Sequence, residues 1–192
     1  CGIDHWKVMA LIWAALPIIN GLVFCKVPIA SLIEEGETGM TLGELCRNKI
    51  FWILMLMMLC AGASEQAVSQ WASTFAEKGL GVTKTIGDLA GPMAFAILMG
   101  SARAFYGKFG DKINLDQFMI GSSALCILSY LTISLSASPL IALIGCSICG
   151  LSVGIMWPGT ISLSSKKFPA GGTAMFALLA MAGDLGGSIG PG

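Results

Sequence analysis

The chain has 192 residues, of which 55% are hydrophobic and only 11% charged, and its formal net charge is zero. A soluble domain carries about 25% charged residues, so this composition excludes a soluble globular domain and predicts an all-α, multi-pass integral membrane protein. The neutral charge balance gives no reason to expect nucleic acid as a partner, which leaves the lipid bilayer as the expected surroundings.

Six apolar stretches are long enough to cross the hydrocarbon core of a bilayer, which needs about 20 helical residues. In chain order they cover residues 8–28, 49–75, 86–106, 115–134, 140–163, and a last stretch that starts near residue 172. The chain begins without methionine, stops inside the last apolar stretch and has no signal-peptide pattern. We therefore expect an internal fragment of a longer membrane protein.

The connection between the first two stretches is the longest and the most polar of the chain. Within it, Thr41 and Glu44 have the spacing of a capping box, which predicts a short amphipathic helix leading into the second stretch. The other connections, 79–85, 107–114, 136–139 and 164–171, are short.

Lysine and arginine alternate between the two sides of the predicted membrane. The connections after the first, third and fifth stretches contain most of these residues: Lys26, Arg47, Lys49, Arg103, Lys108, Lys112, Lys166 and Lys167. The connections after the second and fourth contain only Lys78 and Lys84. Because cytoplasmic loops are enriched in lysine and arginine, we expect the first, third and fifth connections in the cytoplasm of a bacterial-type inner membrane.

The small residues of the apolar stretches have a structural interpretation. Most of the seven cysteines lie in apolar runs, where a thiol behaves as a small hydrophobe; we apply this to Cys146 and Cys149 too, although their spacing matches a redox motif. Gly150-x-x-x-Gly154 and Gly183-x-x-Gly186-Gly187 would let helices approach closely.

The second stretch contains the strongest functional signal, because Glu65, Gln66 and Gln70 are polar residues at membrane depth. A carboxylate there costs about 3 kcal/mol on insertion scales, so such residues line a cavity or face a partner. A carboxylate, two amides and the nearby Trp71 suit a hydroxylated or amine-bearing small molecule. The alternative is an interhelical hydrogen bond. Asp184 is a second intramembrane acid, for which packing and cavity lining stand equal.

Several classes of chemistry find no support in the sequence. There is no phosphate-binding loop, no nucleophile motif and no metal-ligand spacing, and the single histidine, His5, lies near the beginning of the chain. We expect no enzyme activity, no cofactor and no metal.

A charged motif follows the third stretch and reads Gly100-x-x-Arg103-x-x-x-Gly107-x-x-x-Asp111-Lys112. It resembles the cytoplasmic signature of the major facilitator superfamily, in its second-half copy between helices eight and nine. After the aspartate the family signature continues with glycine and a basic pair, where this chain has Lys112, Ile113 and Asn114.

Two further regions resemble the sugar-permease-like branch that includes fucose–proton symporters. They are Gly62-Ala-Ser-Glu65-Gln66-x-x-x-Gln70-Trp71 and the run from Gly150-Leu-Ser-x-Gly154-x-x-Trp157-Pro158 to Gly190-Pro191. The resemblance implies that the six stretches are helices six to eleven of a twelve-helix bundle. Residues 1–30 would be the last helix of the N-terminal half, 31–49 the central cytoplasmic loop, and 50–192 the truncated C-terminal bundle.

The resemblance also implies roles for individual residues. The solute cavity would be lined by Glu65, Gln66, Ser69, Gln70, Trp71, Trp157 and Asp184. A conformational latch on the cytoplasmic side would comprise Arg103, Gly107, Asp111 and Lys112. The rest of the cavity would come from the N-terminal half of the same chain.

These observations predict secondary active transport of a small polar solute, with a sugar-like solute favoured, by alternating access. Coupling to H⁺ through Glu65 is an open alternative, because the coupling acids of the sugar–proton relatives lie in helices outside this chain. The rival hypothesis is a non-transporting membrane scaffold or sensor that has a transporter-like fold. Solute identity, oligomeric state and the choice among symport, antiport and uniport stay open.

Overall fold

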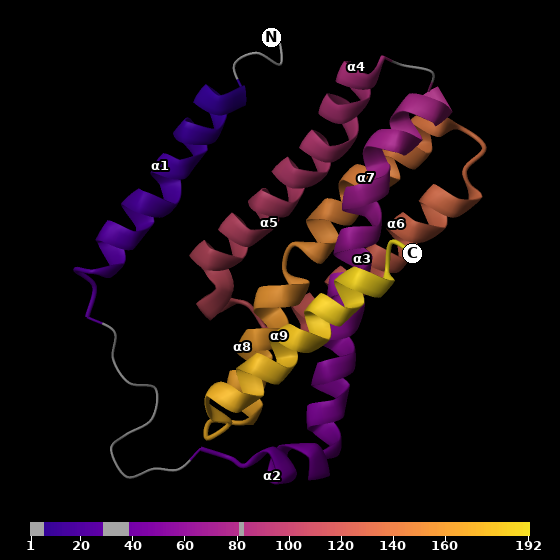
Figure 1. Cartoon of the computed structure of the whole chain (residues 1–192). Coiled ribbons are helices and arrows are strands. Elements are labelled where there is room, and N and C mark those ends of the chain that lie inside the picture. Colours follow the sequence, from indigo (N-terminus) through magenta and orange to yellow (C-terminus); the bar gives the residue numbers. More distant parts are fainter. Residues whose placement is uncertain (1–5, 29–38, 81–82) are drawn as a thin grey trace. The chain divides into compact units, whose positions relative to one another are not determined.

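The computed structural model describes residues 6–28, 39–80 and 83–192, and every regular element in these ranges is helical (Figure 1). The chain divides into two compact units, Cys1–Glu37 and Thr38–Gly192. The first contains α1, Trp6–Phe24, whose helix continues through Pro17. Its large apolar side chains are exposed, Leu11 by 72% and Trp13 by 65%, as expected of a helix that faces lipid.

The second unit begins with the short helix α2, Leu42–Arg47, and the predicted capping box at its start is confirmed. The Thr41 backbone N–H donates to the Glu44 carboxylate at 2.8 Å, and the Glu44 N–H donates to the Thr41 hydroxyl oxygen at 3.4 Å. The hydrogen bonds from the Thr41 backbone and hydroxyl lower the pKa of Glu44, because they stabilise its charged form. The buried Leu45 anchors α2 to the bundle.

Five helical segments of the described residues are long and apolar enough to cross a membrane. They are Lys7–Phe24, Lys49–Gly79, Leu115–Leu135, Leu140–Lys167 and Gly172–Ile189. They agree with five of the six predicted stretches. The helices of the second unit that contain or form them are α3 (Lys49–Leu80), α6 (Leu115–Leu135), α7 (Pro139–Val153), α8 (Met156–Lys167) and α9 (Gly172–Ile189).

The remaining predicted stretch, 86–106, is divided among three consecutive helical segments: α4 (Lys84–Asp88), the π-helical η2 (Leu89–Met93) and α5 (Ala94–Phe109). The helical path from Lys84 to Phe109 is uninterrupted, and it exceeds the roughly 20 residues that a bilayer requires. Pro92 explains the wide turn, because a proline inside a helix lacks the N–H of its backbone bond and crowds the preceding turn.

The connection after α5 is a 3₁₀ turn, η3, Gly110–Lys112. Asn114 then caps α6 by accepting a hydrogen bond from the Gln117 N–H at 3.3 Å. The α8–α9 connection ends at Gly172, whose φ of 62° lies in the left-handed region that favours glycine.

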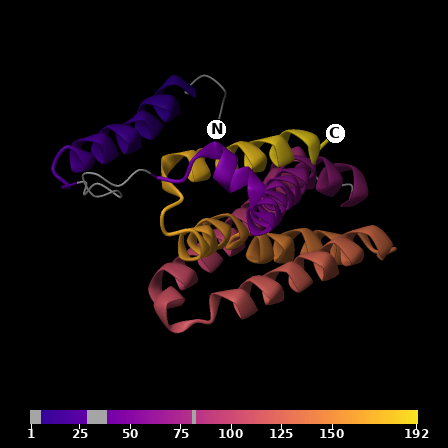
Figure 2. The same ribbon diagram turned by 90° about the horizontal axis from the view of Figure 1, so that it is seen from below.

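Within the second unit, α3 packs most extensively along α9, and α6 packs mainly against α7. Figure 2 shows α9 and α6 on opposite sides, with α3 and the α7–α8 path between them. One buried cluster joins α3, α5, α6 and α7 and includes the free thiols of Cys126, Cys146 and Cys149. A second cluster joins α2, α3 and α9. The interpretation of Cys146 and Cys149 as small apolar residues agrees with their burial.

The connections of this unit alternate between two ends. The α2 segment meets the α8–α9 connection, where the Met40 N–H donates to the Ala170 carbonyl at 2.8 Å. The η3 turn lies toward that end, whereas the α6–α7 connection lies toward the other (Figure 1).

Candidate functional site

A cavity of about 360 Å³ lies among α3, α8 and α9. Its polar lining comes from Glu65, Gln66 and Gln70 on α3, Trp157 on α8, and Asp184 with Ser188 on α9. Five of the seven residues predicted for a solute cavity therefore line the same space. They come from three helices that are distant in sequence, which composition and spacing could not have brought together.

The α3 wall follows from helical spacing. Gln66 and Gln70 are four residues apart and lie on one face, where the Gln70 Nε2 donates to the Gln66 Oε1 at 3.5 Å. Glu65 is one residue earlier on the same wall and is only 19% exposed. The three side chains form one polar stripe with four acceptor oxygens and two amide NH₂ groups.

Glycines set the depth of the cavity. A Cβ at Gly62 would overlap the Gly183 carbonyl, and a Cβ at Gly183 would overlap the Trp157 ring. Glycine at both positions therefore lets the α3 and α9 backbones touch while the indole of Trp157 packs against α9 at Gly183. The predicted close approach at Gly183, Gly186 and Gly187 is confirmed at Gly186, where a Cβ would overlap the Leu59 carbonyl.

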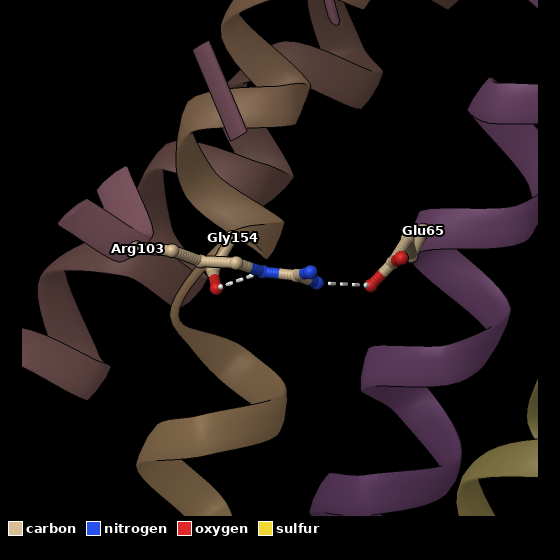
Figure 3. Close-up of polar contacts among 3 residues, drawn as sticks. All are labelled: Glu65, Arg103 and Gly154. Carbon is tan, nitrogen blue, oxygen red and sulfur yellow. Dashed lines mark hydrogen bonds and ion pairs between the residues drawn. The ribbon is translucent and has the colours of Figure 1, made fainter. Parts of the chain in front are cut away.

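A charged contact lies next to this wall (Figure 3). The Arg103 Nη2 donates to the Glu65 Oε2 at 3.4 Å, and the Arg103 Nε donates to the Gly154 carbonyl oxygen at 3.1 Å. One guanidinium thus joins α5, α3 and the junction between α7 and α8. An ion pair at membrane depth reduces the cost of both charges. It is the one salt bridge found in the described ranges.

The two other residues predicted for the cavity lie elsewhere. Ser69 is exposed on α3 and does not line the cavity. Trp71 is 56% exposed, and its Nε1 donates to the Pro191 carbonyl oxygen at 2.9 Å, which ties α3 to the residues after α9. Helical spacing explains the position of Trp71, which lies about 100° around α3 from Gln70. It does not explain Ser69, which is three residues after Gln66 and on the same side of the helix.

The four residues predicted for a latch are not brought together around one contact. Gly107 lies near the end of α5, with open space where a Cβ would be, while Asp111 and Lys112 are exposed in η3. Arg103 pairs with Glu65 and not with Asp111 in the part of the chain that the structure describes. The residue expected on the cytoplasmic side therefore contacts a residue expected in the cavity.

Sequence reasoning missed this pair and the Gly154 carbonyl, although two signals were present. An arginine and a glutamate in neighbouring apolar helices are each costly alone, which favours pairing. Pro158 also follows Gly154 by four residues, which removes the N–H that a continuous helix would offer to the Gly154 carbonyl.

The comparison with protein families adds the identity that the geometry leaves open. Residues 2–191 match the family described as the Major Facilitator Superfamily. The chain belongs to the Major Facilitator Superfamily. Members of this superfamily move small solutes across membranes, so the chain is part of a multi-pass membrane transporter family, and the helical fold agrees with that assignment. Searches of curated proteins and of solved structures found no match.

For a Major Facilitator Superfamily chain, the cavity among α3, α8 and α9 is the candidate solute site. It combines two carboxylates, two amides, a hydroxyl and an indole. The described residues contain no group of three or more histidine, cysteine, aspartate or glutamate side chains that could bind a metal.

Proposed function

We propose that this protein is a secondary active transporter of a small polar solute, with a sugar-like solute favoured, that works by alternating access. The observation on which the proposal rests is the cavity that Glu65, Gln66 and Gln70 share with Trp157 and Asp184. Polar groups at membrane depth are costly unless they face a pathway or a partner, and here five of them face one space.

The chemistry of the cavity favours hydroxylated solutes over anionic ones. Asp184 lines the cavity, and no described residue forms an ion pair with it. Arg103 pairs with Glu65, so the Asp184 carboxyl group has no cationic partner among the described residues. An organic acid would be repelled there, whereas sugar hydroxyls could donate to the carboxylates and stack on Trp157.

We propose further that α3 to α9 correspond to helices seven to eleven of the family and that an N-terminal half completes the cavity. The connections that include α2, η3 and the α8–α9 turn would be cytoplasmic in a bacterial-type inner membrane. The sequence supports this orientation, because these connections contain most of the lysine and arginine residues.

Gly107, Asp111 and Lys112 would act as a cytoplasmic latch at the end of α5. Their exposure in the η3 region leaves them available to a partner half. Proton coupling through Glu65 remains an alternative within the transport hypothesis.

The test is uptake by the full-length transporter in inside-out and right-side-out vesicles, with radiolabelled monosaccharides, amino sugars, nucleosides and dicarboxylic acids. For the solute that is transported, Glu65→Gln should lower kcat/KM by at least about tenfold, as expected for the loss of a hydrogen bond between the solute and a charged group. Glu77→Gln is the matched control, because Glu77 is a second carboxylate on α3 that is exposed and does not line the cavity.

Unchanged uptake and unchanged solute affinity in Glu65→Gln would exclude the cavity assignment. Solute-dependent thermal stabilisation without uptake of any compound would instead favour the rival hypothesis, a sensor or scaffold with a transporter-like fold.

A further inference from the structure

The path from α7 to α8 is interrupted between Val153 and Met156. In a continuous helix, the N–H of residue 158 would donate to the carbonyl of Gly154, four residues earlier. Residue 158 is proline and has no N–H, and its ring crowds that same carbonyl. Pro158 therefore sits in the first turn of a new helix, where a proline is tolerated, and the Gly154 carbonyl is released from the helical hydrogen-bond pattern.

Arg103 supplies the missing donor. Its Nε donates to the Gly154 oxygen at 3.1 Å, and among the described residues this is the hydrogen bond that the carbonyl receives. The close approach depends on glycine, because a Cβ at Gly154 would lie 2.8 Å from the Met99 carbonyl oxygen and 3.0 Å from the Ala102 Cβ, both on α5. Glycine at position 154 thus lets the break lie close enough to α5 for Arg103 to reach it.

The same guanidinium also contacts the cavity wall through Glu65. Arginine can do this because its donors point in different directions from one rigid plane, so that Nε serves one acceptor while Nη2 serves another. Lysine has a single nitrogen and could not reproduce the geometry. α8, which starts at this break, in turn places Trp157 in the cavity opposite Glu65.

We infer that Arg103 is a positioning residue that couples the solute cavity to the break between α7 and α8. A solute group or a proton that takes the place of Arg103 at Glu65 changes the partners of the guanidinium, and with them its hold on the Gly154 carbonyl. The junction that orients Trp157 then responds to what occupies the cavity. This inference rests on the proposed transport function for its purpose, whereas its geometry stands on the two hydrogen bonds of Figure 3.

The first experiment measures thermal unfolding of the full-length protein in two double-mutant cycles. Pro158→Ala restores an N–H for the Gly154 carbonyl and should make the Arg103 bond partly redundant. Arg103→Gln should lower Tm by roughly 5 °C in the parent, the size expected for lost hydrogen bonds to a charged group, and by about half as much with Pro158→Ala. The effects of Arg103→Gln and Glu65→Gln on Tm should also be non-additive.

Two further variants make the result specific. Arg103→Lys should keep the ion pair with Glu65 but lose the hydrogen bond to the Gly154 carbonyl, so its loss of Tm should also be smaller with Pro158→Ala, and it serves in that cycle if Arg103→Gln does not fold. Lys108→Gln is the control, because Lys108 is a cation on α5 that lies over the Phe109 ring and its effect should be additive with Pro158→Ala. Additivity of the Arg103 variants with Pro158→Ala would overturn the inference.

The second experiment detects coupling rather than stability. A single cysteine replaces Ser188 in the cavity, with the native cysteines changed to serine, and a membrane-impermeant methanethiosulfonate reagent labels vesicles of both orientations. Arg103→Gln should change the ratio of the two labelling rates by at least about fivefold, and Pro158→Ala should restore part of the change.

A labelling ratio that stays at the parent value in Arg103→Gln would overturn the coupling, even if Tm falls. Both readouts need no solute, so they do not depend on the outcome of the uptake screen. If no compound is taken up but the Arg103 and Pro158 variants are non-additive, transport is rejected and the coupling stands. If a solute is taken up but the variants are additive, transport stands and the coupling is rejected.

Discussion

The contact between α3 and α9 gives the sharpest stability prediction, because glycine lets the two backbones touch at Gly186. A Cβ added there would overlap the Leu59 carbonyl oxygen, and it would lie 2.8 Å from the carbonyl carbon and 3.0 Å from the Ala63 nitrogen. These obstacles are backbone atoms, which cannot rotate away as a side chain would. In Gly186→Ala the two helices must therefore separate along the interface that contains the cavity.

Overpacking costs about 1–3 kcal/mol where side chains can adjust, and a backbone obstacle places this site at the upper end. For a protein of this size about 3 kcal/mol corresponds to a Tm roughly 6–12 °C lower. The assay is thermal unfolding in detergent, followed by thiol-reactive dye fluorescence. Gly100→Ala is the matched control: Gly100 is inside α5 with nothing within 4 Å of an added Cβ, so Tm should stay the same or rise.

Gly187→Ala completes the series. The atom nearest to its added Cβ is the Gln66 Cγ at 3.1 Å, which belongs to a flexible side chain that lines the cavity. We expect Tm to fall by less than about 3 °C while solute affinity decreases, because the side chain moves into the cavity. Equal Tm values for Gly186→Ala and Gly100→Ala would refute the reasoning about backbone contact.

Two further predictions concern the region around α2. The capping box should weaken in acid: hydrogen bonds from Thr41 lower the pKa of Glu44, so the stabilisation is complete above the ordinary glutamate pKa and is lost as pH falls through the lowered value. Amide hydrogen exchange, corrected for its intrinsic pH dependence, should show that α2 is less protected below the lowered pKa than above it. In Thr41→Ala, α2 should be unprotected on both sides of that pKa. A protection factor of α2 that does not depend on pH would contradict this prediction. Phe51→Ala should cost about 3–5 kcal/mol of stability, because Phe51 is 1% exposed and packs edge-on against Phe168 with ring centroids 6.3 Å apart. Leu56→Ala, at a 60% exposed position on the same helix, is the control for thermal unfolding, and equal losses would contradict the burial argument.

Local signals in the sequence predicted local features well. Thr41 and Glu44 predicted the capping box because every atom involved lies within one helical turn. The pair Gly150 and Gly154 predicted a close helix contact, and both pack against α5, where a Cβ at Gly150 would overlap the Phe95 carbonyl. The length of each apolar run predicted a membrane span, since bilayer thickness sets that length directly. It did not predict the breaks inside a span, because 140–163 is divided between α7 and α8, and 86–106 among α4, η2 and α5.

The side of each helix that packs against protein could not be predicted from such local signals. A membrane helix is apolar on nearly all sides, so its sequence does not identify which side meets protein and which meets lipid. On α6, Ile120 is 69% exposed and Met119 only 5%, although both are large and apolar. Polar residues reduce this ambiguity, which is why Glu65, Gln66 and Gln70 could be assigned to one wall, although Ser69 and Trp71, predicted for the same space, do not line this cavity.

Arg103 shows that position along the chain does not determine which residues a long charged side chain contacts. Its position near the end of an apolar stretch suggested a cytoplasmic role, because distance along the helix was the only measure that the sequence offered. The guanidinium lies at the end of a long side chain, however, and reaches acceptors on α3 and at the α7–α8 junction. Pairing in the membrane depends on that reach and on the cost of an unpaired charge, neither of which follows from position in the chain.

The prolines in the helical regions clarify why this pairing occurs at Gly154. Each proline removes one backbone donor, yet α1 continues through Pro17 and the helix around Pro92 widens into a π turn, so neither recruits a charged side chain in the described contacts. At Pro158 the helix ends and restarts, which turns the carbonyl of Gly154 toward α5. A guanidinium that is already held by Glu65 can fill that position without further cost of burying a charge. The break and the ion pair therefore stabilise each other, and removing either should weaken both.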